Sequence, residues 1–111
     1  KAAASSTIDR AAMIEQMGAF DENAIEMLKL FIDMTKPLIG RIDHAASNKD
    51  VGDLKEAAHS LKGAARSACI NELGEAAAQL QTEAEGGRIV EETIARVIKE
   101  FTRAEDEINR L

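Results

Sequence analysis

Apolar residues recur at three- and four-residue intervals through four long segments of this chain, and short turn signals separate those segments. The segments are 22–46, 51–68, 72–85 and 89–109. This period is typical of amphipathic helices, whose apolar stripe needs another helix to cover it. Four such helices joined by short loops predict an all-α fold, an antiparallel up-down four-helix bundle. A short extra N-terminal helix is expected over 9–17.

Side chains that can cap a helix mark where each helix should begin. Asp9, Asp21, Asp50 and Asn71 stand just before expected helices, where their oxygens can accept backbone N–H groups of the first turn. Pro37 lies inside the expected helix 22–46. Because proline lacks a backbone N–H, it should kink or break that helix, at a cost of about 3 kcal/mol unless packing compensates.

The length of 111 residues suits one domain with one core. We expect the domain to occupy residues 8–111. Residues 1–7 should form a disordered tail, because they are small and offer little to pack. With every apolar stripe covered inside one bundle, we expect a monomer. The core should also take up the flexible side chains of the methionines, which are Met13, Met17, Met27 and Met34.

Charge and cysteine content exclude several classes of function. The chain has 20 acidic and 14 basic residues, and its net charge of -6 disfavours binding to nucleic-acid phosphates. No apolar run approaches the roughly 18 residues that span a bilayer, so no membrane association is expected. The single cysteine, Cys69, fits a reducing, cytoplasmic compartment. The two histidines fall on different helices without a second ligand at metal-binding spacing, so neither a metal site nor a cofactor is predicted.

One histidine is expected to point into solvent from the helix 51–68. At 100° per residue, six small or apolar side chains of this helix gather on one side, which should face the core. His59 points the opposite way. A neutral imidazole nitrogen is a nucleophile that can attack a phosphoryl group, and that form is abundant near neutral pH. The core-facing residues are Leu54, Ala57, Ala58, Leu61, Ala65 and Ala68.

The neighbours of His59 on the same helix face are cationic. Lys55, Lys62 and Arg66 lie three, four or seven residues away, which is the spacing that brings side chains together on a helix surface. Such a patch could attract and neutralise phosphoryl oxygens. Gly63, one turn beyond His59, costs about 1 kcal/mol of helix stability relative to alanine. Because glycine has no side chain, it leaves room for a phosphoryl group and for a partner's backbone.

These residues resemble a known family. The run AHSLKGAA at 58–65 is similar to the His-x-Leu-Lys-Gly signature of histidine-containing phosphotransfer (HPt) domains. The opening Ile8-Asp9, the interior proline, the Asn-Lys-Asp turn before the histidine helix and Leu80-Gln81 extend the resemblance from Ile8 onward. Members often have a second glycine near the following helix corner, where this chain has Cys69.

The resemblance implies a four-helix-bundle phosphocarrier of a two-component, multistep phosphorelay. Such a domain takes a phosphoryl group from the aspartate of one response-regulator receiver domain and passes it to another; a hybrid histidine kinase is a further candidate partner. His59 matches the phosphorylated histidine, Lys62 the lysine that holds phosphoryl oxygens, and Gly63 the small residue that clears space. Gln81 falls where some members have a glutamine hydrogen-bonded to the histidine ring. The divalent metal is expected on the receiver.

The chain has no Gly-x-Gly-x-x-Gly loop and no Walker-type sequence, so it is expected to be a carrier rather than an enzyme that phosphorylates itself. Two alternatives stay open. One is the histidine-bearing domain of a chemotaxis-type kinase, phosphorylated by an ATP-binding domain elsewhere in a longer chain. The other is a helical interaction module whose histidine is never phosphorylated. The helix pair through which histidine kinases dimerise fits less well. Its histidine is usually followed by a carboxylate residue, whereas His59 is followed by Ser60.

Overall fold

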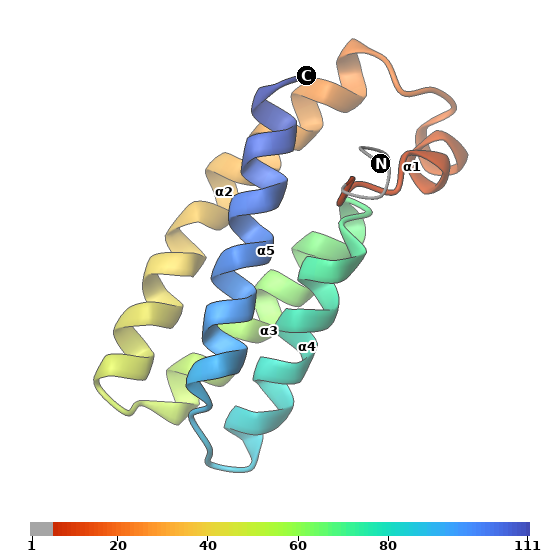
Figure 1. Ribbon diagram of the computed structural model, residues 1–111. Coiled ribbons are helices and arrows are strands. Elements are labelled where there is room, and N and C mark those ends of the chain that lie inside the picture. The colour runs from red at the N-terminus through yellow and green to blue at the C-terminus, as the bar shows by residue number, and fades with distance from the viewer. Residues whose placement is uncertain (1–5) are drawn as a thin grey trace.

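The computed structural model describes residues 6–111, and this part of the chain folds into five helices without a strand (Figure 1). The predicted all-α architecture, four long helices preceded by a short one, is confirmed. None of the described helices is both long and apolar enough to cross a bilayer. The helices are α1 (Arg10–Met17), α2 (Glu22–Ser47), α3 (Val51–Ser67), α4 (Asn71–Glu85) and α5 (Glu91–Asn109).

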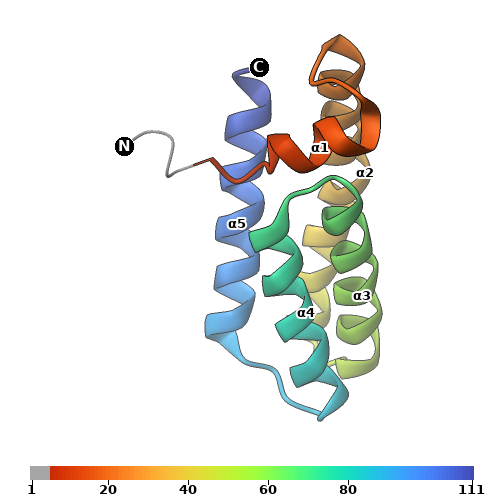
Figure 2. The ribbon, with the colours of Figure 1, turned by 90° about the vertical axis from the view of Figure 1, so that its right-hand side faces the viewer.

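The four long helices form a ring in chain order. α2 packs on α3, α3 on α4, α4 on α5, and α5 closes the ring against α2. The short loops reverse the chain each time, so the bundle is antiparallel, and α3 and α5 lie diagonally opposite each other (Figures 1 and 2). The core contains fully buried leucines from three of the helices, which are Leu28, Leu54, Leu61, Leu73 and Leu80. This arrangement leaves the outer face of α3 open to solvent.

Three of the four predicted caps are confirmed and one is wrong. Asp9, Asp21 and Asp50 each accept a backbone N–H from the first turn of the helix that follows. Asn71 was expected to cap α4, but it is the first residue of that helix and Ile70 occupies the cap position. The Asn71 amide donates instead to Oδ2 of Asp9, at 3.4 Å, and so links the start of α4 to the start of α1.

α2 continues without a break through Pro37. The proline removes the backbone hydrogen bond that the carbonyl of Asp33 would otherwise accept. Both Pro37 and Asp33 are exposed, so water can satisfy that carbonyl. The break that the sequence allowed does not occur, because the lost bond lies on the solvent side and the apolar side of α2 remains packed.

α1 closes the end of the bundle where α3 turns into α4 (Figure 2). Its Met13 is fully buried, as predicted. The backbone N–H of Asp9 donates to the carbonyl of Cys69 in the corner, at 2.8 Å. Cys69 has a φ of 62°, in the left-handed region that favours glycine. The corner therefore needs the backbone conformation that a glycine would supply, and a cysteine adopts it here.

The predicted disordered tail 1–7 is wrong for its last two residues, while residues 1–5 lie outside the described part. Thr7 is buried, and its backbone N–H donates to Oε1 of Glu107 at 2.7 Å. The hydroxyl of Ser6 donates to Oε2 of the same carboxylate at 2.8 Å. Glu107 on α5 thus holds this segment against the bundle, through a contact between residues a hundred positions apart.

Three of the four methionines expected in the core lie at the surface instead. Met17 is 38% exposed, Met27 37% and Met34 67%. Met17 lies on the short helix α1, and Met27 and Met34 line the open groove that α2 forms with the last turns of α3. The bundle therefore leaves part of one apolar stripe uncovered, whereas the expected monomer assumed that every stripe is covered.

Candidate functional site

His59 stands in the middle of α3 on the face turned away from the core. Leu54, Ala58 and Leu61 on the same helix are fully buried, whereas the imidazole is exposed. The helical period that sends small and apolar residues inward turns His59 outward, as the sequence predicted. Its ring is therefore accessible to a second protein.

The imidazole borders a shallow depression between α3 and α4, with a volume of about 480 Å³. Lys55, His59 and Gln81, three of the six residues predicted for the site, line it together. The other three, Lys62, Gly63 and Arg66, follow along α3 outside the depression. Its full lining is Lys55, Glu56, His59, Ser60, Gln81 and Glu85.

The His59 ring is hydrogen-bonded at one of its two nitrogens, by a residue of α4. Oε1 of Gln81 lies 3.4 Å from Nδ1 of His59. The Nε2 amide of Gln81 donates in turn to Oε2 of Glu85, at 3.1 Å. Nε2 of His59 has no partner among residues 6–111. The ring is thus held at one nitrogen, and the other faces solvent.

The cationic residues around His59 differ in how they are placed. Neither Lys55 nor Lys62 forms a hydrogen bond or ion pair with any other described residue, so both ammonium groups are available to a ligand. Arg66 lies against α4, where a Cβ added to Gly74 would meet its Cγ at 3.1 Å. The stem of Arg66 thus covers Gly74.

Gly63 leaves an open surface one turn beyond His59. A Cβ added at this position would meet no atom within 4 Å, and its φ is not in the left-handed region. The fold therefore does not require glycine here. If a side chain must be absent at position 63, the requirement comes from something outside this chain, such as a docked partner.

An ion-pair cluster borders the site on the α2 side. Arg41 of α2 pairs with Asp53 and, at 3.6 Å, with Glu56 on α3. Its side-chain hydrogen bond lowers the pKa of Asp53, and the same bond raises the pKa of Arg41. Glu56 is thereby paired with a cation one turn before His59.

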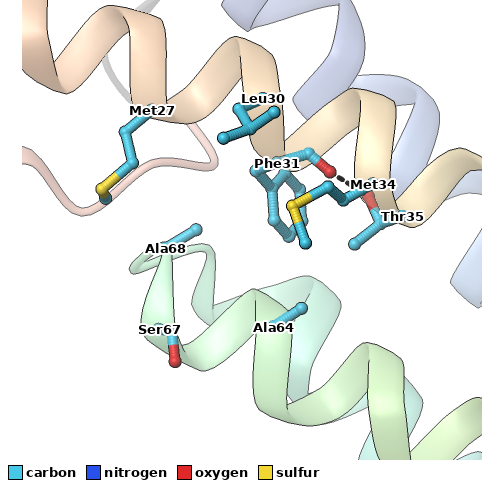
Figure 3. A pocket seen from close by; sticks show the side chains of 8 residues that line it. All are labelled: Met27, Leu30, Phe31, Met34, Thr35, Ala64, Ser67 and Ala68. Atoms are coloured by element: carbon cyan, nitrogen blue, oxygen red, sulfur yellow. Dashed lines mark hydrogen bonds between the residues drawn. The ribbon is translucent and has the colours of Figure 1, made fainter.

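An apolar groove runs between α2 and the last turns of α3, with a volume of about 220 Å³ (Figure 3). On α2, Leu30 is 55% exposed and Met34 67%. Across the groove, Ala64 and Ser67 lie five and eight residues beyond His59, about 7 and 12 Å along the helix axis. The α3 residues of the groove thus start about one and a half turns beyond the histidine. It is lined by Met27, Leu30, Phe31, Met34, Thr35, Ala64, Ser67 and Ala68.

Sequence reasoning missed two parts of this surface. Glu85 lies four residues after Gln81 on one helix, and that spacing alone could have indicated their hydrogen bond. Met27, Leu30 and Met34 recur at helical spacing, which indicates a stripe but not whether a neighbouring helix covers it.

The remaining candidate groups do not join the site. His44 is exposed near the end of α2 and contacts Asn48. Cys69 is a buried free thiol, and desolvation raises its pKa. Among residues 6–111, no three His, Cys, Asp or Glu side chains come together in a way that could hold a metal ion.

The comparisons with known proteins agree with this geometry. A family model described as the Hpt domain matches residues 26–110, which include α3, α4, α5 and nearly all of α2. α1 and the start of α2 lie outside the match. A search of curated proteins found no match, and neither did a search of solved structures.

Proposed function

This chain belongs to the Hpt domain family, and from that premise we propose that it accepts a phosphoryl group on His59 from a receiver-domain aspartate and passes it to a second receiver. Hpt domains are histidine phosphocarriers of phosphorelays rather than kinases. The observation that carries the assignment to His59 is its position. It is an exposed imidazole in the middle of a rigid helix, with Nδ1 held by Gln81 and Nε2 open to solvent.

The transfer follows from the two ring nitrogens. The lone pair of His59 Nε2 attacks the phosphorus of the receiver's aspartyl phosphate, so that a P–N bond forms while the P–O bond to the aspartate breaks. The aspartate leaves with the bonding electrons as a free carboxylate, and the Nδ1 proton stays on the ring. Passing the group to a second receiver reverses these steps. Because the transition state is loose and in line, positioning and charge neutralisation dominate catalysis.

Lys62 and Lys55 are the groups of this chain that neutralise phosphoryl charge. Both ammonium groups lack a partner among the described residues, and both lie within one turn of His59 along α3. The receiver supplies the aspartate and the divalent metal, so this chain needs no cofactor of its own. Gly63 leaves the approach to Nε2 open. Arg66 is the weaker candidate for phosphoryl binding, because its stem packs over Gly74.

We propose that the receiver docks over His59 and extends onto the α2–α3 groove, whose lining on α3 starts five residues beyond the histidine. Exposed apolar side chains such as Met34 and Leu30 become buried in that complex, and about 25 cal/mol is gained per Å² of apolar surface removed from water. The reduced, buried Cys69 fits the cytoplasmic setting predicted from the sequence. A hybrid histidine kinase that carries a receiver domain is a partner of the same kind.

Phosphotransfer from charged receivers tests this function directly. A receiver labelled on its aspartate is mixed with the wild type, with His59→Gln and with the matched control His44→Gln. We expect acid-labile, base-stable label on the wild type and on His44→Gln, and none on His59→Gln. An unlabelled wild type across a panel of receivers would favour the interaction module. Label obtained only from an ATP-binding kinase domain would favour the chemotaxis-type alternative.

A further inference from the structure

We propose that Glu85 is a positioning residue for His59, and that it acts through Gln81 to set which imidazole nitrogen carries the proton. The inference rests on the proposed function, because it concerns the nucleophile of the same transfer. Glu85 and Gln81 lie four residues apart on α4, and His59 faces them from α3. All three side chains line the depression beside the histidine.

The first step is the orientation of the Gln81 amide. An ionised carboxylate can only accept hydrogen bonds, so Glu85 must receive the amide NH₂ group of Gln81. The distance from Gln81 Nε2 to Glu85 Oε2 is 3.1 Å. With its nitrogen turned to Glu85, the amide has only its oxygen left for α3. That oxygen, Oε1, is the atom that lies 3.4 Å from Nδ1 of His59.

The second step is the tautomer of His59. The Gln81 oxygen accepts and cannot donate, so the contact requires the ring proton on Nδ1. A neutral imidazole carries one proton, and Nε2 then has the lone pair. Free histidine in water holds its proton mainly on Nε2, where it blocks attack by that nitrogen. The Glu85–Gln81 pair therefore selects the less common tautomer, the one that presents a nucleophile to solvent.

The same arrangement favours the charge that develops during transfer. As the P–N bond forms at Nε2, the ring gains positive charge while Nδ1 keeps its proton. The hydrogen bond from Nδ1 to the Gln81 oxygen strengthens because its donor becomes charged. Glu85 fixes that oxygen in place and adds a negative charge beyond it. Without Glu85 the amide can turn over and offer its NH₂ group to Nδ1, which favours the unreactive tautomer.

The ring nitrogens report the tautomer directly. Nitrogen-15 NMR spectra of His59 are recorded at a pH high enough for the ring to be neutral. The proteins compared are the wild type, Glu85→Ala and Glu56→Ala. Glu56 is the matched control: it lines the same depression and its removal costs the same charge, but it pairs with Arg41 rather than with Gln81. We expect unprotonated Nε2 to predominate in the wild type and in Glu56→Ala. In Glu85→Ala the population should move toward protonated Nε2.

Transfer kinetics supply the second readout. The rate of labelling from a charged receiver should fall about 2- to 10-fold in Glu85→Ala, the range that one net hydrogen bond corresponds to. Unchanged ring-nitrogen shifts in Glu85→Ala, or equal shifts in both variants, would overturn the inference. A wild type with the expected tautomer that accepts no phosphoryl group from any receiver would instead overturn the proposed function, so the two failures are distinguishable.

Discussion

Arg41 of α2 donates two hydrogen bonds to a single carboxylate oxygen of Asp53 on α3, from Nε at 2.9 Å and from Nη2 at 2.6 Å. The contact joins the two helices at the end of α3 remote from α1. Through that side-chain hydrogen bond Arg41 lowers the pKa of Asp53 below its ordinary value. The pair therefore links the stability of the α2–α3 contact to pH.

The coupling free energy between Arg41 and Asp53 should be present at neutral pH and absent in strong acid. The folded-state pKa of Asp53 lies below the unfolded-state value of about 3.9. The stabilisation is therefore complete above that value and disappears as the pH falls through the folded-state pKa. A double-mutant cycle of Arg41→Gln and Asp53→Asn, measured by urea unfolding at neutral pH and at about pH 2, isolates the pair. Equal coupling at both pH values would contradict this.

Glycine should be better than alanine at position 69, the reverse of the usual order inside a helix. Cys69 has a φ of 62°, a conformation that costs an L-residue about 1–2 kcal/mol and glycine almost nothing. Cys69→Ala and Cys69→Gly both lose the buried sulfur and its contact with Gln16. Chemical denaturation should find Cys69→Gly the more stable by about 1 kcal/mol.

The control for position 69 is Ala95→Gly on the exposed side of α5, which should lose about 1 kcal/mol in the same assay. If Cys69→Ala equalled or exceeded Cys69→Gly in stability, the left-handed corner would not be strained.

Gly63→Ala should make the protein more stable and a poorer phosphoryl acceptor. The new methyl group meets nothing within 4 Å, and alanine stabilises a helix interior by about 0.5–1 kcal/mol relative to glycine. The same methyl group occupies space one turn from His59, where the receiver must approach. Gly40→Ala on α2 is the matched control, since its Cβ also meets open space. It should gain similar stability in thermal unfolding and keep the wild-type transfer rate. Faster transfer by Gly63→Ala would show that the gap serves no docking role.

Lys62→Ala should slow phosphotransfer by about 10-fold and leave the free energy of unfolding within about 0.5 kcal/mol of the wild type. Lys62 has no partner among residues 6–111, so folding loses no ion pair with them, whereas the phosphoryl oxygens lose a charge-assisted hydrogen bond. Single-turnover labelling from a charged receiver measures the first effect and urea unfolding the second. The exposed Lys99 on α5 provides the control variant Lys99→Ala, expected to transfer normally. Similar rates for both variants would remove Lys62 from the site.

The spacing of apolar residues within a helix predicts which side of that helix is buried, and this depends only on nearby sequence. The fold could therefore be predicted well from helical period. The outward direction of His59 followed from its own helix alone. The exposure of Met34 depends on how α3 packs beside α2, and Thr7 is buried where its backbone meets Glu107, a hundred residues away. The part played by Glu85 depends on which end of one amide points where. The surroundings of Met34 and Thr7 are tertiary relationships that no local pattern contains, and so is the contact of the Gln81 amide with His59 on α3.

Met34→Glu should weaken receiver binding while leaving the bundle folded. The side chain is 67% exposed and lines the α2–α3 groove, so a charge there is harmless in the free protein. In the complex it must be desolvated against apolar atoms, and we expect the Kd to rise about 10-fold or more. Thr102→Glu, on α5 diagonally across the bundle from α3, adds the same charge on an exposed position and should leave the Kd unchanged. A wild type that sediments as a dimer, converted to a monomer by Met34→Glu with unaltered receiver binding, would assign the groove to a second copy of the chain instead.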